Sequence, residues 1–150
     1  MVTKNAIESF FSSKKLAVVG VSRSGKKFGN SAMKELKSRG FKVYPVNPNA
    51  DKINGEVCYR SLNSLPEKVD GAVIIVPPNE AGKVVRDAAA AGISQIWLQQ
   101  GSQSNDAVRF CESSGINAVY GECILMFTEP VAGFHKFHRT INKIFRRLPK

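Results

Sequence analysis

The sequence LAVVGVSRSGKKFGN, residues 16–30, decides how the rest of the chain is arranged. It begins with four apolar residues, Leu16 to Val19, a composition typical of a strand that is buried on both faces. The apolar run ends at Gly20, in a small, polar and basic loop. From Gly29 to Gly40 the apolar residues then have helical spacing. A strand, a glycine turn and a helix N-terminus in this order favour anion binding, because free N–H groups and the positive end of the helix dipole lie close together.

The loop is therefore a candidate phosphate cradle, although Gly20 alone is equally compatible with an ordinary tight turn. Its spacing argues against two nucleotide motifs. A dinucleotide fingerprint, G-x-G-x-x-G, has its second glycine where this chain has Ser22. A P-loop, G-x-x-x-x-G-K-[ST], matches from Gly20 to Lys26, but Lys27 replaces the hydroxyl that would bind Mg²⁺. An ATPase is not expected.

Length and charge limit the class of protein. The chain has 150 residues, which suits a single domain with a real core. Its 22 Lys and Arg residues against 12 Asp and Glu residues give a net charge of +10. That charge fits an anionic partner but does not distinguish a nucleotide, a nucleic acid or a membrane surface. Neither a signal peptide nor a membrane-spanning stretch is visible, so we expect a cytoplasmic protein.

The cysteines Cys58, Cys111 and Cys123 form neither an even disulfide set nor a zinc spacing, and we expect free thiols. Beyond them, strands and helices alternate along the chain. Strands are expected at residues 16–19, 41–46, 71–76, 94–99 and 117–120. Helices are expected at 3–12, 29–40, 79–91 (capped by Asn79) and 103–114, and residues 51–70 are expected to be a connection with one helical turn near 61–65. The alternation predicts an α/β fold with a doubly wound, parallel five-stranded sheet.

Ligands of such sheets bind beyond the carboxyl ends of the strands. The residues expected there are Ser22, Asn47, Pro77 and Gln99. Asn47 follows the second strand, where an NAD-binding fold carries Asp or Glu for the ribose hydroxyls. Asn47 and Ser22, which replaces a fingerprint glycine, therefore both argue against NAD binding.

Five pieces of sequence, in order along the chain, resemble those of a known family. They are Gly20-Val21-Ser22-Arg23 with Lys27-Phe28-Gly29-Asn30, Val43-Tyr44-Pro45-Val46-Asn47-Pro48, Val76-Pro77-Pro78, Ile96-Trp97-Leu98-Gln99 with Gly101, and Gly121-Glu122-Cys123. The chain resembles the small stand-alone coenzyme A-binding proteins, a Rossmann-like family related to the CoA-binding domain of the succinyl-CoA synthetase alpha subunit. The resemblance extends over roughly residues 10–128.

The resemblance implies that residues 1–128 form a CoA-binding domain, with coenzyme A across the carboxyl edge of the sheet. The phosphates would meet the loop from Gly20 to Asn30, and the nucleotide portion would lie near Asn47-Pro48 and Val76-Pro77-Pro78. The residues expected to bind CoA are Gly20, Val21, Ser22, Arg23, Lys27, Phe28, Gly29, Asn30, Asn47, Pro48, Val76, Pro77, Pro78, Gln99, Gly101 and Cys123. Stand-alone members have no established catalytic machinery, and the sequence indicates no catalytic residue.

Several of these residues also have a purely structural interpretation. Asn47-Pro48 and Pro77-Pro78 fit stiff turns, and Gln99 could satisfy the end of a strand. Trp97 lies in the middle of a strand and is better explained as core than as a ligand platform. Cys123 matches a family cysteine near the pocket. Packing as a small apolar side chain is the favoured interpretation for it, and a redox or thiol-exchange role is the alternative.

The tail, residues 129–150, has the pattern of an amphipathic basic helix. Its apolar side chains at helical spacing are Phe134, Phe137, Ile141, Ile144, Phe145 and Leu148, and its basic ones are Lys136, Arg139, Lys143, Arg146 and Arg147. Such an apolar stripe favours packing on its own domain or on a homodimer partner. Contact with anionic lipid or nucleic acid is the less favoured alternative. His135 and His138, even with Cys123, lack a fourth ligand and do not predict a metal site.

Two classes of function remain open at this point. The first is a module that binds CoA or acyl-CoA without chemistry of its own, as a sensor, carrier or regulator. The second is a CoA- or nucleotide-dependent enzyme, an oxidoreductase or transferase that uses the same pocket. The sequence shows no acidic residue after the second strand and no Ser–His or His–carboxylate pattern, which favours the first. A nucleic-acid binder is a third interpretation, based only on charge and on the tail.

Overall fold

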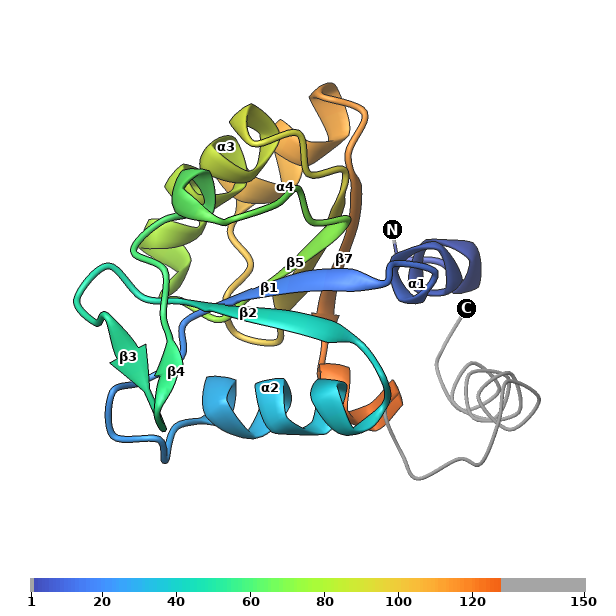
Figure 1. Ribbon diagram of the computed structural model, residues 1–150. Helices are drawn as coiled ribbons and strands as arrows, with labels where there is room; N and C mark the ends of the chain where they lie inside the picture. The colour runs from blue at the N-terminus through green and yellow to red at the C-terminus, as the bar shows by residue number, and fades with distance from the viewer. Residues whose placement is uncertain (1, 128–150) are drawn as a thin grey trace.

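The computed structural model describes residues 2–127. The expected tail helix at 129–150, with His135 and His138, lies outside these residues. The described part folds into three layers, a five-stranded parallel sheet with helices on both faces (Figure 1). The doubly wound, Rossmann-like α/β fold expected from the sequence is confirmed. No helix within residues 2–127 is long and apolar enough to cross a membrane.

The secondary-structure elements follow the expected alternation. The strands of the main sheet are β1 (Lys15–Val19), β2 (Lys42–Val46), β5 (Gly71–Ile74), β6 (Gln95–Gln99) and β7 (Asn117–Glu122). The α-helices are α1 (Lys4–Phe11), α2 (Phe28–Ser38), α3 (Pro78–Ala90) and α4 (Asn105–Ser113). Two short 3-10 helices are η1 (Leu62–Ser64) and η2 (Ile124–Phe127), and a small hairpin is formed by β3 (Lys52–Ile53) and β4 (Glu56–Val57).

The strand order is β2-β1-β5-β6-β7. From β1 the chain moves outward to β2 through α2, and then returns to the other side of β1 to add β5, β6 and β7. Right-handed crossovers in opposite directions place their helices on opposite faces of the sheet. Figure 1 accordingly shows α2 below the sheet and α3 and α4 above it.

The strands β1, β5 and β6 are buried on both faces because helices cover both faces of the sheet. In β1, Leu16 and Val18 belong to the core cluster under α1 and α2. Ala17 and Val19 belong to the cluster under α3 and α4. Trp97, in β6, is completely buried, and its ring lies 5.4 Å from that of Phe10. The interpretation of Trp97 as a core residue is therefore correct.

The segment 51–70 is more structured than expected. It contains the β3–β4 hairpin, which turns at Asn54 and Gly55 with φ values of 50° and 80°. Positive φ at both central residues is the backbone of a type I′ turn, for which Asn-Gly is the preferred sequence. The signal was present in the sequence, but strands of two residues carry no period-2 pattern that would reveal them.

The start of α3 also differs from the expectation. Asn79 was expected to cap the helix, whereas α3 begins at Pro78 and its N-cap residue is Pro77. Proline suits the first helical position because its missing N–H would have no intrahelical partner there. Its fixed φ outweighs the capping preference of the asparagine that follows.

Candidate functional site

The candidate site lies where the strand order reverses, at the carboxyl ends of β1 and β5. The loops after these two strands lead away on opposite faces of the sheet, and the crevice between them is the usual ligand position in doubly wound folds. Gly20, the first residue after β1, has φ +114°. A Cβ on Gly20 would lie 1.9 Å from the carbonyl oxygen of Ile75, so only glycine lets the two backbones approach this closely.

The first turn of α2 packs against the same point. A Cβ on Gly29 would lie 2.5 Å from the carbonyl oxygen of Gly20 and 3.2 Å from the Cα of Val21. The two glycines thus bring together the end of β1, the start of α2 and the segment after β5. We call this meeting point of three backbone segments the cradle, and a Cβ on either glycine would overlap its neighbouring backbone.

The N-termini of α2 and α3, the helices that follow β1 and β5, differ from those of α1 and α4 in how they are capped. Thr3 caps α1 and Ser104 caps α4, each accepting a hydrogen bond from the backbone N–H three residues later. The N-cap residues of α2 and α3, Lys27 and Pro77, make no such side-chain bond. In the first turn of α2 the Asn30 N–H donates to the Lys27 carbonyl at 3.0 Å, which leaves the N–H groups of Phe28 and Gly29 without a partner within residues 2–127. These two groups can meet an anion, which the helix dipole also attracts.

The loop between β1 and α2 is held in a compact turn by its own hydroxyl groups. The Ser22 carbonyl accepts from the Gly25 N–H at 3.1 Å, and the Ser22 Oγ accepts from the Ser24 N–H at 3.2 Å. The Ser24 Oγ in turn accepts from the Lys26 N–H at 3.3 Å. A Cβ on Gly25 would lie 2.7 Å from the Asn54 Oδ1, so the hairpin β3–β4 braces the far side of the loop.

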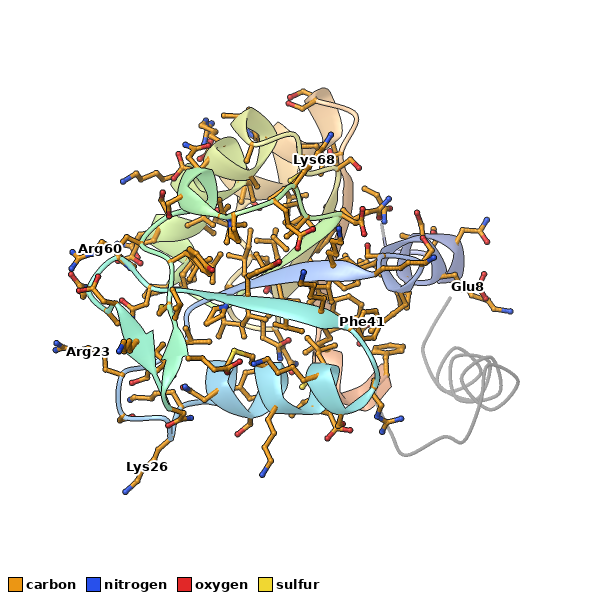
Figure 2. The ribbon with its side chains drawn as sticks, viewed as in Figure 1. Glu8, Arg23, Lys26, Phe41, Arg60 and Lys68 are labelled. Atoms are coloured by element: carbon orange, nitrogen blue, oxygen red, sulfur yellow. The ribbon has the colours of Figure 1, made fainter. Side chains whose placement is uncertain are left out.

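The basic side chains of the loop are exposed. Arg23, Lys26 and Lys27 make no ion pair with any residue between 2 and 127. Figure 2 shows Arg23 and Lys26 extending from the loop away from the body of the protein. Their charges are therefore not neutralised within the described part of the chain and can meet an anionic ligand.

Comparison with known proteins identifies the family. The family model described as a CoA binding domain matches residues 14–129, which include the whole sheet and the cradle. The chain belongs to this family. The resemblance to CoA-binding proteins expected from the sequence is confirmed.

Curated relatives of this CoA-binding domain include longer ligases. It is 43% identical to Acetate--CoA ligase [ADP-forming] II of Archaeoglobus fulgidus over 89 residues, 58% of this chain and 13% of the ligase. It is 25% identical to the alpha subunit of Acetate--CoA ligase [ADP-forming] II of Pyrococcus furiosus over 155 residues, 96% of this chain and 32% of the subunit. The chain thus spans a third or less of the length of these two relatives.

A solved structure of similar size exists for a conserved hypothetical protein from Pyrococcus furiosus. It superposes with a TM-score of 0.70 at 44% sequence identity, over 75% of this chain and 97% of the other. The CoA-binding domain therefore has a structural neighbour that consists of little more than the domain.

Two asparagines of the CoA-binding domain bind the backbone of the loop. The Asn30 Oδ1 accepts from the Ser22 N–H at 2.9 Å, and the Asn30 Nδ2 donates to the Ser22 carbonyl at 3.0 Å. The Asn47 Nδ2 donates to the Val21 carbonyl at 2.8 Å. These two residues come from α2 and from the end of β2, so three elements meet at one dipeptide.

The segment after β5 is also held by a neighbour that the sequence did not indicate. The Val76 N–H donates to the Oγ of Ser102 at 3.1 Å, and Ser102 is buried. The Ser102 N–H donates to the Gln99 carbonyl at 2.7 Å. Pro77 and Pro78, directly after Val76, are exposed. Nothing in the residue type of Ser102 distinguishes it from other loop serines.

The remaining predicted site residues lie farther along the same edge. Gln99 is 6% exposed, and its Oε1 accepts from the Ile124 N–H at 3.0 Å. It thus satisfies the end of a strand, as its structural interpretation proposed. Gly101 follows it with φ +92°. Because neighbouring strands are about 4.8 Å apart, β6 and β7 lie roughly 10 and 14 Å from β1, and only an elongated ligand could contact all of these residues.

The three thiols differ in exposure. Burial raises the pKa of Cys58, and it raises the pKa of Cys111 to about 11, so both remain protonated and pack as apolar groups. Cys123, after β7, is half-buried and is the most accessible of the three. Burial also raises the pKa of its neighbour Glu122. Residues 2–127 contain no group of three His, Cys, Asp or Glu side chains that could hold a metal ion.

Proposed function

We propose that this chain binds coenzyme A, or an acyl-CoA, across the carboxyl edge of its sheet. The observation that carries the proposal is the match of residues 14–129 to a CoA binding domain, because the matched segment contains the backbone cradle at the strand-order reversal. The physical support is the α2 N-terminus, which no side chain caps, together with the exposed basic side chains of the adjoining loop.

The phosphates of the ligand would lie at the first turn of α2. CoA carries a diphosphate and a 3′-phosphate, about four negative charges, given a second phosphate pKa near 6. A helix N-terminus contributes only about half a positive charge. Side chains must supply most of the rest, and Arg23 and Lys27 flank the turn on exposed positions.

The other parts of CoA would extend in two directions from the cradle. The nucleotide portion would lie near Asn47-Pro48 and Val76-Pro77-Pro78, at the ends of β2 and β5. The pantetheine arm would run over the ends of β6 and β7, toward Gln99, Gly101 and Cys123. An elongated ligand of this kind could contact predicted site residues both at β1 and at β6 and β7, which lie roughly 10 and 14 Å from β1.

The role we favour is that of a CoA-binding module without its own chemistry, a sensor, carrier or regulator. The structural neighbour that consists of little more than the domain supports this choice. A second candidate is a part of a CoA ligase, which the alignment with the Pyrococcus furiosus ligase alpha subunit over 96% of this chain favours. A cytoplasmic location and a homodimer stay predictions.

Calorimetric titration of the purified chain with CoA tests the proposal. We expect saturable binding of one CoA per chain, and native mass spectrometry should show the mass of any CoA or acyl-CoA that copurifies. Titration with acetyl-CoA would identify the preferred acyl form. Absence of binding to both ligands, in a protein shown to be folded, would refute the proposed function.

A further inference from the structure

Asn30 has a side chain whose position is unusual for a helix surface. It is the third residue of α2, yet only 5% of it is exposed. Its amide pairs with both backbone groups of Ser22, at 2.9 Å to the N–H and 3.0 Å to the carbonyl. The Asn30 side chain thus makes the two backbone hydrogen bonds that a neighbouring strand would otherwise make to Ser22.

Asn47 makes the corresponding contact one residue earlier in the loop. Its Nδ2 donates to the Val21 carbonyl at 2.8 Å, while its Oδ1 accepts from the Asn49 N–H at 2.7 Å. Both polar atoms of the Asn47 amide are therefore engaged by backbone. Asn30 and Asn47 together form what we call the asparagine clamp.

We propose that the asparagine clamp positions the phosphate loop, and that neither asparagine needs to contact the ligand to do so. The clamp holds the Val21–Ser22 backbone from two different elements, the first turn of α2 and the end of β2, and so fixes the direction in which the chain leaves Gly20. This inference rests on the proposed function for its ligand, but the clamp itself is a property of the ligand-free chain.

A polar loop of this composition requires such support. Ordering one residue of backbone costs about 1–2 kcal/mol, and a loop that is ordered only on binding subtracts that cost from affinity. The segment from Ser22 to Lys27 has no buried side chain to anchor it. Hydrogen bonds from the clamp order its first residue before a ligand arrives.

The clamp also gives Asn47 a role that differs from that of the acidic residue in NAD-binding folds. In Asn47→Asp the Nδ2 donor would be lost, and a carboxylate oxygen would face the Val21 carbonyl. We expect this variant to weaken CoA binding without gaining NAD binding. A gain of NAD binding would mean that Asn47 faces the ligand, and would overturn the inference.

Amide hydrogen exchange in the ligand-free protein tests the clamp directly. The Ser22 N–H should be protected in the parent chain, and Asn30→Ala should raise its exchange rate by up to about tenfold, the most that a net hydrogen bond is worth. Asn30→Asp keeps an acceptor for the Ser22 N–H but turns a carboxylate oxygen toward the Ser22 carbonyl, so it should restore only part of the protection. Ser31→Ala, at an exposed position of the same helix turn, and Asn49→Ala are the matched controls.

Calorimetry with CoA provides the second readout. Asn30→Ala and Asn47→Ala should each lower the affinity for CoA by about tenfold. The affinity for dephospho-CoA should fall by the same factor, because a displaced loop affects every ligand that carries the diphosphate. Unchanged Ser22 exchange in Asn30→Ala, or raised exchange with unchanged CoA affinity, would overturn the inference. If the parent chain binds no CoA, the proposed function fails, and the exchange data alone still decide whether the clamp orders the loop.

Discussion

Gly20 and Ile75 approach so closely that a Cβ on Gly20 would lie 1.9 Å from the Ile75 carbonyl oxygen. This contact joins the turn after β1 to the segment after β5. The atoms on both sides of this contact are backbone, so no change of rotamer could relieve a side chain placed there. The Ile75 N–H also donates to the Val19 carbonyl at 2.8 Å, which keeps the two segments in register. The shape of the cradle therefore depends on Gly20 before any ligand is considered.

Gly20→Ala should destabilise the protein strongly and abolish CoA binding. The substitution combines a positive φ of +114° with a backbone overlap. We expect a loss of about 3 kcal/mol or more in the free energy of unfolding, measured with urea. The control is Gly40→Ala, where φ is +91° and nothing lies within 4 Å of the Cβ. Backbone strain alone should there lower the free energy of unfolding by about 1–2 kcal/mol. Equal losses in the two variants would contradict the role of the Ile75 contact.

CoA should raise the melting temperature of the chain, and NAD should not. Ser22 replaces a fingerprint glycine, and Asn47, whose amide is bonded to backbone, replaces the ribose-binding acid. At about 100 times its Kd a ligand adds about 2.7 kcal/mol of stability, which corresponds to roughly 5–10 °C for a chain of this size. A thermal-shift comparison measures this. An upshift with NAD and none with CoA would reverse the prediction.

The elements of the sheet could be predicted because their sequences carry the pattern of their environment. Leu16 to Val19 are all apolar, and the structure buries both faces of β1. Trp97 was correctly assigned to the core from its place in the middle of a strand. The hairpin at Asn54 and Gly55 was missed because its strands are too short for a pattern, and the start of α3 was displaced because Pro78 outweighs Asn79.

The location of the site stays a prediction from the sequence, and its internal geometry could not be predicted at all. Strand, glycine turn and helix are local features, so their succession around Gly20 and Gly29 could be predicted. The bond of Ser102 to the Val76 N–H joins residues 26 positions apart, and depends on the register of β5 with β6. The asparagine clamp likewise requires the loop path, which residue types do not specify.

The stability of the protein should depend on pH through Glu67. Its carboxylate accepts hydrogen bonds from Lys15, Lys42 and Tyr44, and these contacts lower the pKa of Glu67 from 4.5 to about 2. A pKa lowered in the folded state adds stability that is fully present above pH 4.5 and is lost as the pH falls toward 2. Urea unfolding at several pH values should show this loss.

Glu67→Gln is the matched variant, because it keeps the size of the side chain but cannot ionise. Its stability should be lower than that of the parent at pH 7, and the two should converge as the pH falls toward 2. Salt should reduce the difference, since these groups are partly exposed. Parallel pH curves for the two proteins would show that Glu67 contributes nothing through its charge.

Removal of residues 131–150 tests the expectation for the tail, which lies outside the described residues. If its apolar stripe packs on the domain or on a second subunit, truncation should expose apolar surface and cause aggregation or a change of oligomeric state. Size-exclusion chromatography with light scattering measures both. A truncated protein that keeps its stability and assembly, and only loses affinity for DNA or anionic lipid, would favour the alternative.

Arg23→Ala and Lys27→Ala should each weaken CoA binding by about 1–3 kcal/mol, the range for charge-assisted hydrogen bonds. Lys26→Ala is the matched control and should cost less. Lys27 has an extended backbone, with φ −84° and ψ 166°, so we expect the side chains of Lys26 and Lys27 to point in different directions. Calorimetric titration of the three variants with CoA measures the differences.

Dephospho-CoA separates the two phosphate groups of the ligand. A side chain that binds only the 3′-phosphate loses its effect when that phosphate is absent, whereas one that binds the diphosphate keeps it. We expect at least one of Arg23→Ala and Lys27→Ala to have no effect on dephospho-CoA, which would assign that residue to the 3′-phosphate. If both variants bind CoA as tightly as the parent, the loop is a solvated turn, and the α2 N-terminus is left with about half a charge to meet the phosphates.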